Sequence, residues 1–113
     1  MPFIAITTSK RLGHSQKEAL KARLGRDIAI IPGKTEAALM LDICDGHTMY
    51  YAGETKHCAY IDVRLYGTAP FEKKEEFSTA LFALMKENAG LEPDAVYITF
   101  LEYENWGLRG ILK

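Results

Sequence analysis

The chain has 113 residues, of which 48% are hydrophobic and 26% are charged. This length suits one domain with its own core, and the composition is that of an ordinary globular protein. The 14 basic and 15 acidic residues give a formal net charge of −1, which argues against a nucleic-acid-binding or membrane-surface protein. No apolar run approaches the roughly 20 residues of a membrane span, and the start of the chain has no signal-peptide pattern. We therefore expect a cytoplasmic protein, with secretion without a signal peptide as the alternative.

The cysteines and histidines predict neither a disulfide framework nor a metal site. Cys44 and Cys58 have no framework spacing, so we expect reduced, half-buried thiols. His14, His47 and His57 fit no metal-ligand spacing and are expected at the surface or in turns. We expect no metal and no cofactor.

The first residues combine a predicted strand with a proline at its start. Phe3–Ile6 is apolar without alternation, which predicts a strand buried on both faces. Proline is tolerated as the first residue of a strand. If Met1 is removed, Pro2 carries a free secondary amine, and apolar surroundings or a nearby cation lower the pKa of an α-amine below about 8. Such an amine suits proton abstraction. In the alternative interpretation, Pro2 is only a stiff second residue.

The next segment predicts a helix that begins at a capping box in Ser15–Glu18. Pro32 and Gly33 end this helix, and Lys34 follows in the turn. The apolar positions recur at helical spacing and predict one buried stripe: Leu20, Leu24, Ile28 and Ile31.

The middle of the chain predicts strands. Ala38–Cys44 is the second strand, and Met49–Tyr51 is a candidate for a short edge strand. Residues from Cys58 to Tyr66 alternate between apolar and polar, which predicts a strand with one buried face. That face consists of Ala59, Ile61, Val63 and Leu65.

The last third predicts a helix, a strand and a tail. The helix spans Phe71–Glu87 after Pro70, and a turn at residues 88–90 ends it. Val96–Leu101 is a strong strand, and the tail is expected to form an irregular corner and a short strand. The inward face of the helix is predicted to hold Phe77, Leu81, Leu84 and Met85.

The elements follow the order strand, helix, strand, twice. Similar spacings separate Ile4 from Leu39 and Ile61 from Tyr97, which indicates an internal two-fold repeat. Right-handed crossovers then place both helices on one face of a four-stranded sheet, giving an α+β fold of two pseudo-symmetric β-α-β units. The other face would expose several tyrosines and apolar groups, so we infer an oligomer packed through its sheets.

Several short motifs, weak singly, form a specific set in this order and spacing. The chain resembles the tautomerase superfamily, specifically the macrophage migration inhibitory factor family of phenylpyruvate tautomerases. The resemblance implies that residues 1–113 form a single tautomerase-like domain. It also implies a homotrimer with a central channel and active sites at the subunit boundaries. The matching motifs are Met1-Pro2, Gly33-Lys34, Gly53 with Cys58, Tyr66-Gly67, Pro93–Ile98 and Asn105-Trp106-Gly107.

The resemblance also implies roles for five residues. Pro2 would be the catalytic base, and Lys34 with the backbone N–H of Tyr66 would hold the substrate carboxylate. Tyr97 of a neighbouring subunit and Trp106 would line the aromatic pocket. Three alternatives stay open: Lys34 as a solvated charge after its helix, Tyr97 as core packing, and Trp106 as a residue buried in the tail corner.

Three positions depart from the family's pattern. Vertebrate members carry a Cys-x-x-Cys pair, but Ile61 stands where the second thiol would follow Cys58, so we expect no thiol-oxidoreductase activity. Thr99 occupies a position that is often asparagine. Ala38 replaces a pocket tyrosine, which predicts a wider or differently polar entrance.

The leading hypothesis is a keto–enol tautomerase for an aromatic 2-keto acid, with no nucleic-acid or membrane partner. A non-enzymatic, cytokine-like or partner-binding protein on the same trimer is the second hypothesis. A ferredoxin-like ligand-binding module, in which Met1-Pro2 has no role, is the third. If the base is not Pro2, the carboxylates to test are Glu36, Asp62 and Glu104.

Overall fold

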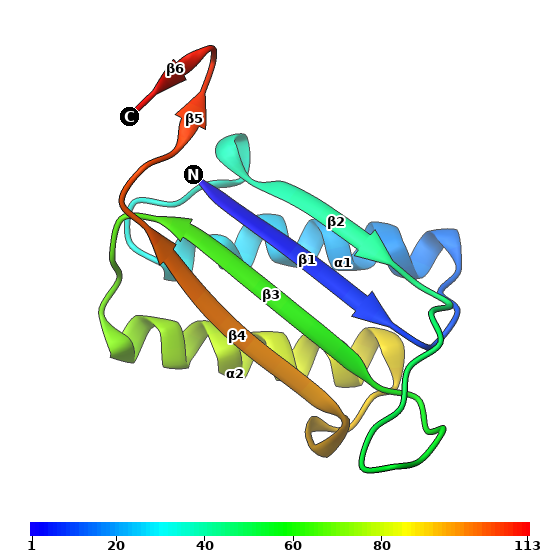
Figure 1. The fold of residues 1–113 in the computed structure, drawn as a ribbon. Coiled ribbons are helices and arrows are strands. Elements are labelled where there is room, and N and C mark those ends of the chain that lie inside the picture. The colour runs from blue at the N-terminus through cyan, green and yellow to red at the C-terminus, as the bar shows by residue number, and fades with distance from the viewer.

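A computed structural model describes residues 1–113 and contains a four-stranded sheet backed by two helices (Figure 1). Its strands are β1 (Pro2–Thr8), β2 (Met40–Cys44), β3 (Ala59–Tyr66) and β4 (Val96–Tyr103). Their order across the sheet is β2-β1-β3-β4.

Two parallel pairs meet at an antiparallel centre. β1 pairs with β2 and β3 with β4 in parallel, whereas β1 and β3 run antiparallel. The parallel pairs are connected through α1 (His14–Asp27) and α2 (Phe71–Ala89), and both helices lie behind the sheet in Figure 1. The predicted α+β fold of two β-α-β units is therefore confirmed.

One hydrophobic core fills the space between the sheet and the helices. The predicted apolar stripes of both helices are fully or almost fully buried in it, as is the predicted inward face of β3. Both stripes and the β3 face are therefore confirmed. Their residues are Leu20, Leu24, Ile28, Ile31, Phe77, Leu81, Leu84 and Met85 from the helices, and Ala59, Ile61, Val63 and Leu65 from β3.

The prediction that β1 is buried on both faces is wrong for the single chain. Burial alternates along β1: Ile4 and Ile6 are buried against the helices, while Phe3 and Ala5 are half-buried on the other side. The reason is that the helices cover only one face of the sheet (Figure 1).

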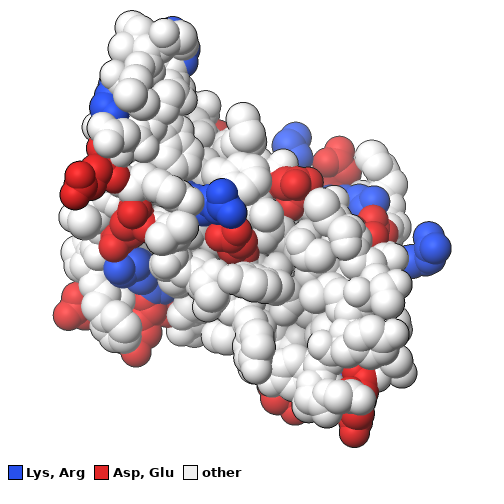
Figure 2. Space-filling view, in the orientation of Figure 1, with Lys and Arg blue, Asp and Glu red and all other residues white.

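The uncovered face of the sheet, which we call the open face, carries both apolar and charged groups. Figure 2 shows that most of this side is uncharged, although a basic and an acidic side chain adjoin near its middle. Exposed large apolar residues on its strands are Met40, Tyr60, Tyr97 and Leu101. The predicted bare face is thus present.

The first helix begins and ends differently from the prediction. Its N-cap is Gly13, whose N–H donates to Oε1 of Gln16 at 2.8 Å, so the predicted cap at Ser15 is wrong. The α-helix ends at Asp27, before Pro32, and a 3₁₀ turn at Ile28–Ile30 continues the chain.

Two predicted strand segments in the middle of the chain need correction. Glu36–Ala38 forms a 3₁₀ turn, so β2 begins at Met40 rather than at Ala38. Met49–Tyr51 forms no strand, because Tyr51 makes only an isolated bridge to Glu54 across a tight turn.

The histidines and Cys44 lie where they were expected, but the prediction of a half-buried Cys58 is wrong, because this side chain lies in the buried part of the chain. Cys44 is half-buried, Cys58 is fully buried, and neither is in a disulfide. His14, His47 and His57 are all exposed.

The tail forms a two-stranded hairpin that projects beyond the sheet near the N-terminus (Figure 1). Its strands are β5 (Gly107–Leu108) and β6 (Ile111–Leu112), where one short strand was expected. The turn between them places Arg109 at φ 52° and Gly110 at φ 80°, as a two-residue hairpin turn requires. None of the helices is long and apolar enough to cross a membrane.

Candidate active site

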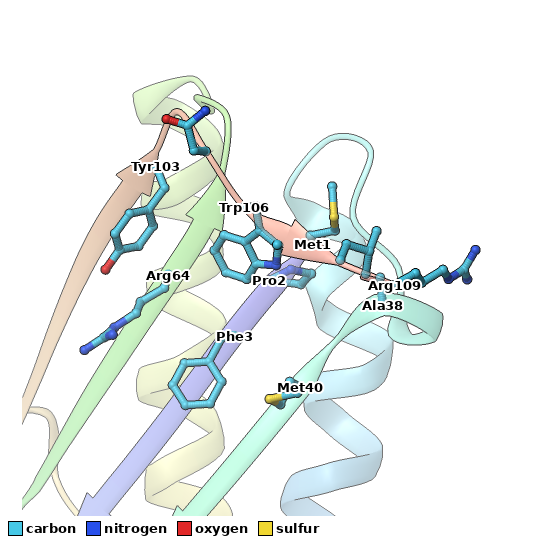
Figure 3. Close-up of a pocket in the computed structure, with 12 residues that line it drawn as sticks. Met1, Pro2, Phe3, Ala38, Met40, Arg64, Tyr103, Trp106 and Arg109 are labelled. Atoms are coloured by element: carbon cyan, nitrogen blue, oxygen red, sulfur yellow. The ribbon is translucent and has the colours of Figure 1, made fainter. Parts of the chain in front are cut away.

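A surface pocket of about 670 Å³ opens where β1 begins (Figure 3). It lies between the N-terminus, the start of β2, the ends of β3 and β4, and the C-terminal hairpin. No aspartate or glutamate lines it. The lining residues are Met1, Pro2, Phe3, Ala38, Met40, Arg64, Tyr103, Asn105, Trp106, Gly107, Leu108 and Arg109.

The chain start supplies an amine with a lowered pKa. Burial lowers the pKa of the Met1 α-amine to about 6, and the nearby ammonium groups of Lys34 and Lys113 act in the same direction. Pro2 is the next residue and the first of β1, whose pairing with Leu65 on β3 fixes its position. The Met1 α-amine is therefore mostly neutral near physiological pH.

Lys34 and the backbone of Tyr66 meet beside the chain start. The Lys34 ammonium donates to the Tyr66 carbonyl oxygen at 2.8 Å, which holds the lysine near the amine although it does not line the pocket. The Tyr66 N–H donates to the Met1 carbonyl oxygen at 3.2 Å. A cation and a backbone donor thus flank the first peptide group of the chain.

Trp106 lies in the middle of the pocket wall, above Pro2 in Figure 3. It is half-buried, and its ring packs edge-on against Tyr103 with centroids 5.9 Å apart. Its backbone exchanges two hydrogen bonds with Lys113, which fixes the hairpin over the site. Trp106 therefore belongs both to the tail corner and to the pocket.

Tyr97 lies elsewhere in the same chain. It pairs with Tyr60 near the start of β3, whereas Pro2 pairs with Leu65 near its end. Five residues of strand separate the two pairs on β3, a distance of about 17 Å. The Tyr97 ring instead contacts Tyr51, with centroids 5.3 Å apart, and its side chain is 60% exposed. Tyr97 is thus neither core packing nor part of the Pro2 pocket within one chain.

Sequence reasoning missed several lining residues, of which Phe3, Arg64 and Tyr103 carry the most chemistry. Phe3 pairs directly with Arg64 across β1 and β3, and the guanidinium lies 6.0 Å from the ring centroid. Tyr103 pairs with Tyr66, one residue beyond Leu65. Alternation could have placed each side chain on the open face, but only the strand register brings them to one pocket.

Among the departures from the family pattern, only Ala38 borders the pocket. The Thr99 hydroxyl is bonded to the Tyr60 hydroxyl at 2.8 Å on the open face, away from Pro2. The alternative carboxylates Glu36, Asp62 and Glu104 do not line the pocket.

We compared the chain with a family model and with curated proteins. The family model described as "Macrophage migration inhibitory factor (MIF)" matches residues 1–111. A curated relative, D-dopachrome decarboxylase of Xenopus tropicalis, is 27% identical over 109 residues, covering 94% of this chain and 90% of that protein.

Solved structures of similar proteins share the fold. MIF2 of Leishmania major superposes with a TM-score of 0.92 at 22% identity, covering 100% of this chain and 97% of that chain. A macrophage migration inhibitory factor homologue of Prochlorococcus marinus has a TM-score of 0.86 at 25% identity, with 97% of each chain covered.

Proposed function

Because the chain belongs to the macrophage migration inhibitory factor family, we propose that it is a keto–enol tautomerase for an aromatic 2-keto acid such as phenylpyruvate. The free amine of Pro2, exposed once Met1 is removed, is the general base. The observation that carries this proposal is the place of Pro2: it lies at the start of β1, in a pocket with aromatic walls, beside a cation that disfavours protonation of an amine.

The proposed reaction moves one proton and needs no cofactor. The neutral Pro2 nitrogen removes a proton from the carbon next to the keto group. The C–H electron pair forms the new C=C bond, and the carbonyl oxygen takes a proton from water to give the enol. The protonated Pro2 then gives its proton to the hydroxide that this leaves, which restores the neutral amine and the water. In the reverse direction the amine first takes a proton from water and returns it to carbon, and the enol O–H gives its proton to the resulting hydroxide. A positioned base of this kind contributes roughly 10²–10⁴-fold to the rate.

The Met1 carbonyl suggests where the substrate carboxylate binds. In the unprocessed chain this oxygen accepts the Tyr66 N–H, while the Lys34 ammonium lies on the Tyr66 carbonyl. Removal of Met1 takes away the acceptor and leaves a free donor next to a cation and the Pro2 amine. A carboxylate oxygen can replace the lost carbonyl oxygen at the Tyr66 N–H, with Lys34 supplying the charge.

The aromatic group of the substrate then lies against Trp106, Tyr103 and Phe3, which line the rest of the pocket (Figure 3). Tyr97 joins the site only if a second subunit supplies it, since its own chain holds it about 17 Å from Pro2. We therefore include a homotrimer with sites at the subunit boundaries in the proposal.

The test compares Pro2→Gly with the wild type, after mass spectrometry has established that Met1 is absent from both. Ketonisation of phenylpyruvate enol is followed by ultraviolet absorbance. We expect kcat/KM to fall by about 10²-fold or more, because glycine keeps a terminal amine but holds it less rigidly. Ala5→Gly weakens the same strand without touching the amine and should retain the rate.

A full rate in Pro2→Gly would assign the base to another group. Processed wild-type protein without any turnover would refute the tautomerase proposal and favour the partner-binding hypothesis. Protein that retains Met1 should be inactive, because its Pro2 nitrogen is an amide.

A further inference from the structure

Arg64 lines the pocket and is a cationic group distinct from Lys34, which lies beside the pocket. We propose that Arg64 binds a second anionic group of the substrate, so that the preferred substrate is an aromatic 2-keto acid with an acidic substituent on its ring. This inference rests on the proposed function for the keto-acid end and adds the chemistry of the far end.

The lining of the pocket is basic. Two arginines line it, Arg64 and Arg109, and no carboxylate side chain does. In Figure 3 both guanidinium groups point away from Trp106 and Pro2, and Arg109 extends past Ala38 on one side of the pocket. Arg64 lies with Tyr103 on the other side, next to the Phe3 ring. Arg64 is therefore the arginine that an aromatic ligand on Phe3 would meet.

The Arg64 side chain is oriented by the protein, yet it has donors to spare. Its Nε and Nη2 both donate to the same oxygen of Asp62, Oδ2, at 3.2 and 3.0 Å. Neither of these bonds uses the Nη1 group, and Asp62 and then Tyr103 raise the pKa of Arg64. The side chain is 45% exposed, whereas that of Asp62 is 29% exposed, so the guanidinium is the more accessible member of the pair. Asp62 thus acts as a positioning residue that fixes the plane of the guanidinium.

A neutral ring would fit this wall poorly. It would cover the Nη1 donors without offering them an acceptor, and an unpaired polar group costs free energy when covered. A carboxylate on the ring would accept those donors in a charge-assisted hydrogen bond. Lys34 at one end and Arg64 at the other would then select for two anionic groups separated by an apolar body.

The test uses binding as well as turnover. Two unreactive ligands, 4-carboxycinnamate and 4-methylcinnamate, differ only in the ring substituent, which is an anionic acceptor in the first and an apolar group in the second. The sequence has a single tryptophan, and Trp106 lines the pocket, so quenching of its fluorescence reports both dissociation constants. We expect the wild type to bind the carboxy ligand about tenfold more tightly or better, the range expected for a hydrogen bond to a charged group.

Arg64→Gln should bind the two ligands with about equal affinity. Its affinity for the methyl ligand should stay at the wild-type value, which would show that the pocket is intact. Arg64→Lys should restore part of the preference, because it keeps the charge without the fork of donors. The matched control is Arg26→Gln. Arg26 is also exposed and paired with an aspartate, at 3.3 Å from Asp27, but lies at the end of α1 behind the sheet. Its preference should equal that of the wild type.

Equal affinities for the two ligands in the wild type, or an unchanged preference in Arg64→Gln, would overturn the assignment. Turnover of 4-carboxyphenylpyruvate and 4-methylphenylpyruvate separates this inference from the proposed function. A binding preference without turnover of either compound refutes the tautomerase reaction and keeps the Arg64 site. Equal kcat/KM for both compounds keeps the reaction and refutes the Arg64 site.

Discussion

Lys34 combines two effects in one side chain. Its ammonium is held on the Tyr66 carbonyl at 2.8 Å, where we propose that it attracts the substrate carboxylate. The same charge lowers the pKa of the α-amine at the chain start, second only to burial. We therefore propose that this lysine both binds the substrate carboxylate and, once Met1 is removed, lowers the pKa of the Pro2 amine.

Lys34→Ala should separate these two effects. The KM for phenylpyruvate should rise by more than kcat falls, because carboxylate binding contributes equally to the ground state and the transition state. Loss of the neighbouring cation makes it easier to protonate the Pro2 amine, so the pKa of this amine rises. The acid limb of the pH profile of kcat/KM then moves to higher pH. Steady-state kinetics across pH measure both. Lys21→Ala, an exposed position on α1, serves as the control. An unmoved KM would remove Lys34 from the site.

At the residue scale, the sequence predicted those pocket residues that belong to a recognisable motif. It did not predict those that reach the pocket only through the pairing register of the strands. Pro2 and Trp106 were predicted from motifs, and the structure places both in one pocket. Arg64 was missed because its neighbour Phe3 is far away in sequence. The two residues meet only through the antiparallel register of β1 and β3, which the sequence pattern does not determine.

At the element scale, Asp45 ties the end of β2 to the start of α1. Its carboxylate accepts the Leu12 N–H at 2.8 Å and lies 3.1 Å from the Lys17 ammonium. These contacts lower the pKa of Asp45 in the folded protein, the Leu12 hydrogen bond first. A carboxyl whose pKa is lowered by folding stabilises the protein above its unfolded pKa, and this stabilisation is lost as the pH falls through the folded pKa.

Asp45→Asn should therefore lower the unfolding temperature at pH 7 and flatten its decline toward acid pH. The comparison is thermal unfolding of both proteins between pH 7 and pH 3, followed by circular dichroism. Asp94→Asn removes an exposed carboxylate and should change neither quantity. Parallel curves for Asp45→Asn and the wild type would mean that Asp45 does not anchor the two elements.

The end of α2 depends on a glycine. Gly90 has φ 66°, and a Cβ there would lie 3.0 Å from the Lys10 ammonium, which donates to the Ala89 carbonyl oxygen at the helix end. Gly90→Ala should destabilise the fold by about 1 kcal/mol from backbone strain alone, with more if Lys10 is displaced. Denaturant unfolding measures this. Gly107→Ala, with no atom near its Cβ and no positive φ, should cost clearly less.

Element positions were more predictable than element ends. The stripe from Leu20 to Ile31 is fully buried as predicted, although the α-helix itself stops at Asp27 and a 3₁₀ turn follows. The spacing of apolar residues therefore predicted which side chains face the core. It did not predict the change from α-helical to 3₁₀ hydrogen bonding after Asp27. Met49–Tyr51 has strand-forming residues but no strand partner, so it remained a turn.

At the scale of the whole molecule, the open face is the feature that a single chain leaves unexplained. Met40, Tyr97 and Leu101 are 67%, 60% and 50% exposed there, on three of the positions that alternate toward this face. Burying such side chains stabilises association by roughly 25 cal/mol per Å² of apolar surface. We infer that the open face packs against other copies of the chain, as the proposed homotrimer requires.

The oligomer and the site can be tested together with Leu101→Glu. Leu101 lies on the open face of the edge strand β4, directly opposite Arg64. A glutamate there would place a charge in the proposed subunit contact, where desolvation makes it costly to bury even beside a cation. We expect the wild type to sediment as a trimer at micromolar concentration and Leu101→Glu to sediment as a smaller species. Ala22→Glu adds the same charge on the exposed side of α1 and should leave the trimer intact.

The Pro2 pocket within each chain should survive in Leu101→Glu, yet its turnover should fall, because Tyr97 can reach the site only from a neighbouring chain. A wild type that sediments as a monomer at this concentration would refute the trimer. A monomeric Leu101→Glu with full activity would show that one chain contains the complete site and that Tyr97 has no part in it.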